Sequence, residues 1–390
     1  MHSLLLYLLK IIMEEKEIFI AGAASIFGLS EIKRAFATLG IHVSFVEAPF
    51  MLNYVTIQED EPVLFKNEVS SDAIIIPLTE FWISYCVKTR CCLISDKALA
   101  ASRSKKYLYE LFALLGIDSV KIYDSVEQAH RALAQGLSVV VKPLGLCSGL
   151  GVEVVTADKK EKLDAYVEHS ATIKTKNMRL MQLQNEGCMI TEYVAGQEYS
   201  ADCFYFKGRI SVVRVCKKKI VLINDKPCVV VYQLVKPCVQ IEAKLAEWMN
   251  VLFEKQNISF AQFDFIVNNE TNRIVPVDFA CRIGGGLTEL LKQTGANPYA
   301  DAIKGTCREY DGGKILTQLN YLSTKSGHLL RDDFKLAEGT QFVYKHIGDY
   351  VINNPSSVGS RTAIVIQQRD SEELPDGIEK KLLIDEAWIK

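Results

Sequence analysis

The hydrophobic pattern of the first hundred residues alternates between short apolar runs and amphipathic segments. Apolar runs at 18–21, 43–46 and 73–76 predict buried strands, and the segments 30–39 and 79–88 have the three- and four-residue spacing of helices. Strands that alternate with helices favour a parallel sheet. We therefore expect a small parallel sheet covered by helices and ending near residue 100.

The same alternation continues to about residue 190. It predicts helices and strands at 105–116 (helix), from Asp124 or Ser125 to 135 (helix), 139–142 (strand), 152–155 (strand) and 158–169 (helix). The polar stretch 172–187 has no clear period, and we expect a loop there.

From Met189 onward, successive strands follow one another through tight turns. The predicted turns lie at Lys207-Gly208, Asn224-Asp225 and 268–272, and this pattern is typical of an antiparallel sheet. Two further helices are predicted, at 241–256 and 287–293, and the tail after residue 305 mixes strand and loop.

Composition narrows the classes of function. The chain has 390 residues, 24% of them charged, and a net charge of −2. No long basic stripe is present, so nucleic-acid binding is not expected, and the densest basic run, Lys217-Lys218-Lys219, is interpreted as a solvated hairpin tip. Eleven cysteines without a Cys-x-x-Cys pair predict reduced thiols, and the spacing of the six histidines does not predict a zinc site.

The apolar N-terminus, residues 1–12, has about half the ~20 residues that cross a bilayer, and no small-residue cleavage site follows it. Met13 is therefore an alternative start to Met1. We expect a cytoplasmic protein without membrane association.

A glycine-rich loop between two predicted strands holds the first group of residues with recognisable chemistry. The strand delivers Lys142, and three glycines, among them Gly149, follow together with Ser148. Glycines let backbone N–H groups approach a phosphate, and the lysine adds a positive charge. Because the lysine precedes the glycines, this is not a P-loop, and a flexible turn explains the glycines equally well.

A second group lies where the antiparallel pattern begins. Glu192 ends an apolar strand, Tyr193 and Val194 follow it, and Glu198 comes after a tight glycine connection. Glu192 could accept from an adenine amino group while the next two backbone units pair with the ring, and Glu198 could bind ribose hydroxyls. Taken alone, these residues also fit surface carboxylates on a hairpin.

A third group consists of two aspartates among apolar neighbours on successive strands, Asp264 and Asp278, followed by Arg282. Aspartate is rarely buried unless it is paired or bound to a cation, and carboxylates on adjacent strands can share Mg²⁺. The arginine fork can clamp a carboxylate or a phosphate. A buried Asp–Arg ion pair is the alternative interpretation.

In this order and spacing, the three groups resemble the ATP-grasp superfamily, in the branch of carboxylate–amine ligases such as the bacterial L-amino-acid (dipeptide) ligases. The resemblance spans roughly residues 17–305. It implies an α/β fold of four parts: an N-terminal Rossmann-like domain at 13–104, a connecting helix at 105–120, a small lid subdomain at 121–194 and a larger α+β C-terminal catalytic domain at 195–390. ATP would bind between the lid and the C-terminal domain.

The resemblance also implies roles for single residues. The two nucleotide lysines correspond to Lys105, with Lys106 as the adjacent alternative, and to Lys142, which is also a catalytic candidate. The loop over the phosphates corresponds to Ser148 and Gly149, the adenine segment to Glu192, Tyr193 and Val194, and the ribose ligand to Glu198. The carboxylates for Mg²⁺, or Mn²⁺ as an alternative ion, correspond to Asp264 and Asp278, and the arginine facing the reacting carboxyl to Arg282.

Two positions depart from the family's pattern. Both metal positions are Asp, where at least the second is usually Glu, and Ala280 replaces an asparagine that supplies an amide ligand. Small residues at that position also occur in the peptide-forming branch, which favours this branch, and a copy with weakened metal binding or no catalysis is the other explanation.

The implied reaction uses Mg·ATP to activate a carboxylic acid as an acyl phosphate, which an amine then attacks, releasing ADP and phosphate. Arg282 and the amides of residues 284–286 would stabilise the intermediate. The substrates would be small molecules, and a homodimer is the default expectation.

Three other functions stay open. One is a bicarbonate-using carboxylase of the same fold, and another is an ATP-binding sensor or scaffold without turnover, which Ala280 and the Asp pair favour. A dinucleotide dehydrogenase is less favoured, because the turn at 22–28 lacks the Gly-x-Gly-x-x-Gly pattern.

Overall fold

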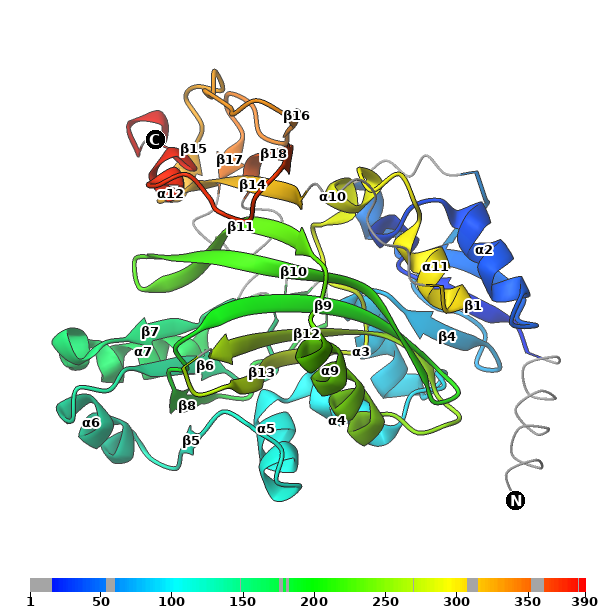
Figure 1. Cartoon of the computed structure of the whole chain (residues 1–390), viewed down its shortest axis with the longest axis horizontal. Helices are drawn as coiled ribbons and strands as arrows, with labels where there is room; N and C mark the ends of the chain where they lie inside the picture. Colours follow the sequence, from blue (N-terminus) through cyan, green and yellow to red (C-terminus); the bar gives the residue numbers. More distant parts are fainter. Residues whose placement is uncertain are drawn as a thin grey trace.

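The computed structural model describes residues 16–53, 60–147, 149–174, 178–179, 182–268, 270–306, 315–351, 361–384 and 386–390. The apolar N-terminus, Met13 and Ser148 lie outside these residues. A large antiparallel sheet forms the centre, with the N-terminal domain on one side, a small lid on another and C-terminal strands on a third (Figure 1). In the described part of the chain, no helix has the length and apolar character needed to cross a membrane.

The N-terminal sheet is parallel, as the alternating pattern predicted, with the order β3-β2-β1-β4. Its elements are β1 (Ile18–Ala21), η1 (Ala23–Ser25), α2 (Leu29–Ala37), β2 (Val43–Glu47), η2 (Pro49–Asn53), β3 (Val63–Phe65), β4 (Ile74–Pro77) and α3 (Glu80–Thr89). Ile18, Ile20 and Phe45 of the strands pack in one core with Phe36 of α2. The apolar side chains that define the pattern therefore hold α2 against the sheet.

Two helices follow directly on one another, α4 (Asp96–Arg103) and α5 (Lys105–Leu114), although the pattern predicted only the second. Ser95 caps α4 and Ser104 caps α5, because each hydroxyl accepts a hydrogen bond from a first-turn N–H. The break at Ser104 makes Lys105 the first residue of α5.

The lid is a small sheet of order β5-β8-β6-β7 covered on one face by helices. Its elements are β5 (Ile122–Tyr123), α6 (Val126–Ala134), β6 (Val139–Pro143), β7 (Glu153–Val155), η3 (Ala157–Lys162), α7 (Leu163–Thr172) and β8 (Cys188–Glu192). Val139 and Val141 of β6 pack on α6 and α7. Since side chains alternate along a strand, Val140 and Lys142 lie on the opposite face.

The central sheet has the order β13-β12-β9-β10-β11-β14-β18-β16 and is antiparallel along this path. Its strands are β9 (Gln197–Phe206), β10 (Arg209–Ile223), β11 (Lys226–Val235), β12 (Ile258–Asn268), β13 (Arg273–Ala280), β14 (Ile315–Ser323), β16 (Thr340–Val343) and β18 (Arg361–Arg369). The predicted turns at 207–208, 224–225 and 268–272 connect these strands.

The interpretation of Lys217-Lys218-Lys219 as a hairpin tip is wrong. These lysines lie inside β10, which continues to Ile223, and the turn follows only at Asn224. The alternation of β10 turns Lys218 inward, where it is 6% exposed, whereas Lys219 faces solvent.

The turn between β10 and β11 contacts the lid. The backbone N–H of Val154 donates to the carbonyl oxygen of Asp225 at 2.9 Å. The Asp225 carboxylate accepts from Lys162 Nζ at 2.8 Å and from the Tyr166 hydroxyl at 2.6 Å, and it also pairs with Lys159. This turn therefore joins the lid to the central sheet.

The remaining helices pack around the central sheet. They are α9 (Val239–Leu252), α10 (Thr288–Lys292), α11 (Pro298–Lys304) and α12 (Ile378–Lys381), with η5 (Glu386–Trp388). The pattern missed α11, although an Asn cap, a first-turn Pro and a final Gly mark its ends. Tyr299 of α11 packs with Phe36 and Phe204, so the N-terminal domain and the central sheet share one core.

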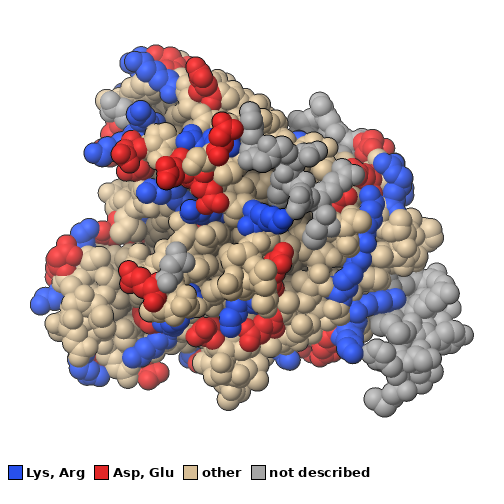
Figure 2. Space-filling model, viewed as in Figure 1, with Lys and Arg blue, Asp and Glu red and all other residues tan. Residues whose placement is uncertain are grey.

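Short strands complete the C-terminal region, β15 (Gly327–His328), β17 (Tyr350–Val351) and β19 (Leu383–Ile384). On the viewed face of the surface, basic and acidic side chains are interspersed, and acidic residues adjoin the longest basic run (Figure 2). The domain boundaries drawn from the sequence stay a prediction.

Candidate functional site

A cavity of about 250 Å³ lies between the lid and the central sheet. Every site residue predicted from the sequence lines it, except Ser148, which lies outside the described residues. They are Lys105, Lys142, Gly149, Glu192, Tyr193, Val194, Glu198, Asp264, Asp278 and Arg282. The fold therefore brings residues as far apart in the sequence as Lys105 and Arg282, which are separated by 177 positions, to one site.

The two aspartates are direct neighbours across a strand pair, since Asp264 of β12 is in register with Asp278 of β13. Like charges directly opposite one another repel. Each carboxylate is offset by a lysine: Lys218 lies 2.8 Å from Asp264, and Lys105 lies 3.0 Å from Asp278. Both carboxylates are partly exposed on the cavity. This arrangement suits Mg²⁺, which takes one or two protein carboxylates and completes its shell with phosphate and water oxygens.

Lys218 was missed by the sequence analysis, and it lies at the centre of the site. Its ammonium lies 2.8 Å from both Asp264 and Glu198. Burial alone would lower the pKa of Lys218, but the two carboxylates outweigh it and raise the pKa. Lys218 therefore stays protonated and places a positive charge between the predicted ribose and metal residues. The alternation of β10 was the signal that could have found it.

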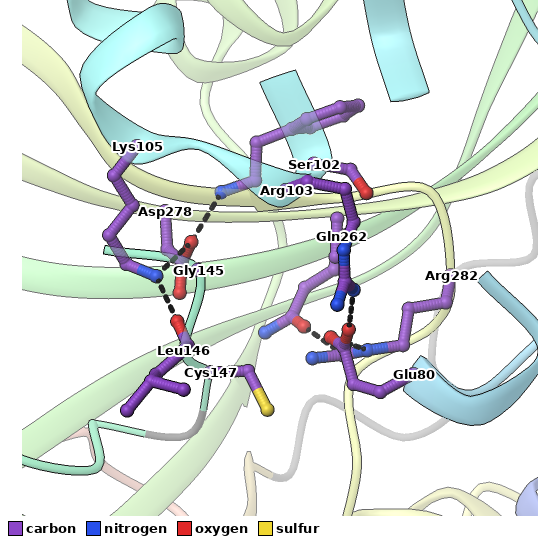
Figure 3. Close-up of a pocket in the computed structure, with 12 residues that line it drawn as sticks. Glu80, Ser102, Arg103, Lys105, Gly145, Leu146, Cys147, Gln262, Asp278 and Arg282 are labelled. Atoms are coloured by element: carbon purple, nitrogen blue, oxygen red, sulfur yellow. Dashed lines mark hydrogen bonds and ion pairs between the residues drawn. The ribbon is translucent and has the colours of Figure 1, made fainter. Parts of the chain in front are cut away.

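Lys105, and not Lys106, reaches the cavity. Its ammonium donates to the carbonyl oxygen of Leu146 at 2.7 Å and contacts Asp278 (Figure 3). Lys106 is half exposed and lies 3.7 Å from Glu110 on the same helix. Lys105 thus links the N-terminus of α5 both to the predicted phosphate loop and to Asp278, one of the two predicted metal carboxylates.

The predicted phosphate loop approaches neighbouring backbone closely at Gly145. This residue has φ +73°, and a Cβ there would lie 2.5 Å from the carbonyl oxygen of Gln184. Both the left-handed backbone and the close approach require glycine. Glycine at 145 is therefore needed for the fold of the loop, and its role at a phosphate stays a prediction.

Lys142 is buried on the cavity face of β6. Its ammonium donates to the Tyr109 hydroxyl at 3.0 Å, and this hydroxyl donates in turn to the carbonyl oxygen of Val277 at 2.6 Å. Burial and then the nearby Lys105 lower the pKa of Lys142 to about 8. The cation is held without a direct carboxylate partner among the described residues, so an anionic ligand would stabilise it.

The predicted adenine segment is partly engaged within the protein. Oε1 of Glu192 accepts from Arg273 at 3.2 Å and from the N–H of Lys121 at 3.1 Å. The N–H of Tyr193 donates to the carbonyl oxygen of Ser138 at 3.1 Å. The backbone N–H of Tyr193, which was predicted to pair with the adenine ring, therefore already donates to another backbone group.

Arg282 has a carboxylate partner that the sequence did not reveal. Its Nε donates to Oε1 of Glu80 at 2.6 Å, and Oε2 of Glu80 accepts from Arg103 at 2.6 Å (Figure 3). Burial alone would raise the pKa of Glu80, but the two arginines outweigh it and lower the pKa. Because Glu80 lies 202 residues before Arg282, no local pattern could have paired them.

Gln262 supplies an amide beside the position of Ala280. The two residues are opposite one another in the β12–β13 pair. The Gln262 amide donates to Asp264 at 3.1 Å and accepts from Arg282 at 2.7 Å. A side-chain amide is thus present at the site, supplied by the strand opposite the one on which the family's asparagine is expected.

Gly284, which follows Arg282, has a structural role that the sequence analysis did not predict. The N–H of Gly284 donates to Asp202 at 2.8 Å, and Asp202 pairs with Arg214 at 2.8 Å. Both members of this pair are buried. A Cβ at residue 284 would lie 2.3 Å from the Arg214 guanidinium. The expectation that the amide of Gly284 stabilises an intermediate is therefore wrong in this structure, because Asp202 already accepts from it.

Residues 135–289 match the family model of the ATP-grasp domain. The chain thus contains an ATP-grasp domain, as its motifs indicated. No curated protein matches the sequence significantly.

Solved structures extend this similarity to the whole fold. An L-amino acid ligase from Bacillus licheniformis is 15% identical with a TM-score of 0.60, over 94% of this chain and 97% of that one. A phosphoribosylglycinamide synthetase from Anaerococcus prevotii is 16% identical with a TM-score of 0.52, over 94% and 96%. The biotin carboxylase domain of a Hydrogenobacter thermophilus 2-oxoglutarate carboxylase is 15% identical with a TM-score of 0.55, over 91% and 86%. The predicted ATP-grasp fold is confirmed.

Proposed function

We propose that this protein is an ATP-dependent carboxylate–amine ligase that joins amino-acid-type substrates through an acyl phosphate and releases ADP and phosphate. One observation carries the proposal. Lysines from three separate elements, Lys105, Lys142 and Lys218, line one cavity with two opposed aspartates and with Arg282. Clustered cations beside a pair of carboxylates suit a polyphosphate and its metal ion.

At the nucleotide end, Asp264 and Asp278 would hold Mg²⁺, which when bound neutralises charge on the transferring phosphoryl group. Lys105 and Lys218 now pair with these carboxylates. With ATP present, they would turn toward phosphate oxygens, because a lysine ammonium is a flexible point charge. Lys142 would bind the phosphates from the lid side.

At the acid end, Arg282 would orient the carboxylate and stabilise the acyl phosphate. Glu80 and Gln262 hold its guanidinium in place. A carboxylate oxygen attacks the γ-phosphorus and ADP leaves. The amine nitrogen then attacks the acyl carbon, phosphate leaves, and the nitrogen loses a proton.

The test is ADP and phosphate release by the purified protein with Mg·ATP, against amino acids offered singly and in pairs. We expect release that depends on a particular pair, with an amide product of matching mass. AMP and pyrophosphate as products would contradict the acyl-phosphate mechanism.

Two alternatives are separated by the same assay. The similarity to a biotin carboxylase domain favours a bicarbonate-using carboxylase, which would release ADP only with bicarbonate and form no amide. Ala280 favours a sensor or scaffold, for which ATP would raise the melting temperature without turnover under any substrate mixture. The cytoplasmic location and the homodimer stay predictions.

A further inference from the structure

The cavity contains a third arginine that neither the motifs nor the proposed reaction use. Arg361, the first residue of β18, is 6% exposed and lines the cavity together with Arg282 and Arg214. These other two arginines have carboxylate partners, Glu80 and Asp202. Among the residues that the structure describes, Arg361 has none.

The guanidinium of Arg361 is held in position by neutral groups. It donates to the carbonyl oxygen of Gly286 at 2.5 Å, and it lies over the Tyr232 ring, 5.7 Å from the centroid. Gln318 donates to the same carbonyl oxygen. A guanidinium has five N–H donors, and a buried arginine is normally paired with an anion. Within the described residues, the remaining donors of Arg361 thus have no anionic partner.

Arg361 also lies at the side of the cavity away from the predicted metal carboxylates. In the central sheet, β18 is separated from β12 by β9, β10, β11 and β14. Its neighbour in the cavity is the segment of Gly285 and Leu287, which follows Arg282. Since Arg282 marks the reacting carboxyl, an amine that attacks from the side opposite the phosphates would approach past Arg361.

We propose that Arg361 binds a carboxylate of the amine substrate, one that takes no part in the reaction, and so restricts the amine to molecules that carry such a group. This inference rests on the proposed ligase function and adds a specificity residue to it. Arg361 lies outside the segment 135–289 that matches the family model, so the C-terminal strands supply this contact.

The experiment compares an amino acid with its methyl ester as the amine, using the acid–amine pair found in the ADP-release panel. The ester keeps the amine and the side chain, but it carries no carboxylate and cannot itself be activated. For the unaltered protein we expect kcat/KM to be about 10- to 100-fold lower with the ester, which is the effect of losing a charged hydrogen-bond partner. In Arg361→Gln this ratio should fall to about one.

Arg361→Lys keeps the charge without the planar fork, so its ratio should be intermediate. The control is Arg331→Gln, which removes an exposed arginine of the same C-terminal region and should leave the ratio unchanged. An equal loss for both amines in Arg361→Gln would make Arg361 purely structural and overturn the proposal. A change confined to the KM for ATP, or to the KM for the acid, would assign the anion to the phosphates or to the acid instead.

Failure of the ligase function is separable from failure of this inference. If no pair gives product, thermal stabilisation is measured with a non-hydrolysable ATP analogue and the same amino acids and methyl esters. Stronger stabilisation by the free acids, lost in Arg361→Gln, supports the contact without turnover. No difference between acid and ester in the unaltered protein would overturn it.

Discussion

Ion pairs at the two ends of the cavity, the proposed nucleotide end and the proposed acid end, differ in their burial and in how rigidly they hold their geometry. At the nucleotide end, Lys105–Asp278 and Lys218–Asp264 face the cavity through partly exposed carboxylates. At the acid end, the Arg214–Asp202 pair is buried and Glu80 is bonded by two arginines. Lysine is a flexible point charge, whereas the arginine fork fixes geometry. The lysine pairs therefore suit exchange with a ligand, and the arginine pairs suit a rigid scaffold.

The largest effect should come from removing a carboxylate that we propose as a ligand of the metal. Asp278→Asn should lower kcat/KM for ATP by about 1,000-fold, since a metal contributes several kcal/mol of charge stabilisation in the transition state. ADP release at saturating Mg²⁺ measures it. Asp333→Asn, at an exposed position, is the matched control. Activity within tenfold of the unaltered protein would show that Asp278 is no metal ligand.

Breaking a scaffold pair should act on stability before it acts on ligands. Asp202→Asn leaves the buried Arg214 without a counter-charge and should lower the free energy of unfolding by about 3 kcal/mol. Urea denaturation measures the loss. A double variant with Leu at 202 and Met at 214 should recover much of it, because an apolar pair needs no counter-charge. A loss no larger than that of a surface substitution would remove the contrast between the two ends.

Weakening the other scaffold pair should affect the acid and spare the nucleotide. Glu80→Gln removes the charge that holds Arg282, so the KM for the acid should rise roughly 10- to 100-fold while the KM for ATP stays within a few-fold. Steady-state kinetics with each substrate varied in turn measures both. Glu110→Gln, on the exposed face of α5, serves as control. A matching rise in both KM values would place Arg282 at the phosphates.

Activity should also depend on pH through Lys142 at the proposed nucleotide end. Lys142 has a pKa of about 8, below the ordinary value for lysine. It is mostly charged below pH 8 and loses its proton as pH rises, so kcat/KM for ATP should fall by about fivefold between pH 8 and pH 9. Lys142→Arg keeps its charge in this range and should flatten this limb. A falling limb that persists unchanged in Lys142→Arg would assign the titration to another group.

The smallest effect is expected at the contact between the lid and the β10–β11 turn. Asp225→Asn weakens the pairs with Lys159 and Lys162, which are about 40% exposed and therefore screened. The KM for ATP should rise by about two- to fivefold, and amides of β7 should exchange hydrogen faster. Hydrogen exchange without nucleotide tests this directly, and unchanged exchange in β7 would mean that the turn does not restrain the lid.

Sequence reasoning predicted more of the residues at the proposed nucleotide end of the cavity than at the proposed acid end. Lys142, Glu192 and Asp264 were predicted from strand motifs, and all three line the cavity, while their roles stay predictions. Glu80 and Arg361 were missed, since their partners lie 202 and 75 residues away and no local pattern reports such a pairing. The burial of Lys218 could have been predicted from the sequence, because side chains alternate along a strand. The three-lysine run was instead interpreted from its composition alone.

The contact between Glu80 and Arg282 has a consequence for how such enzymes can be recombined. A chimera that joined residues 135–289 to a foreign N-terminal domain would carry Arg282 without the acid that neutralises it. The buried guanidinium would then recruit another anion or shift out of place. Exchange of the N-terminal domain should therefore succeed only when the chimera keeps both the acid at position 80 and the arginine at position 282. The two residues then have to be transferred as a pair, although they lie far apart in the sequence.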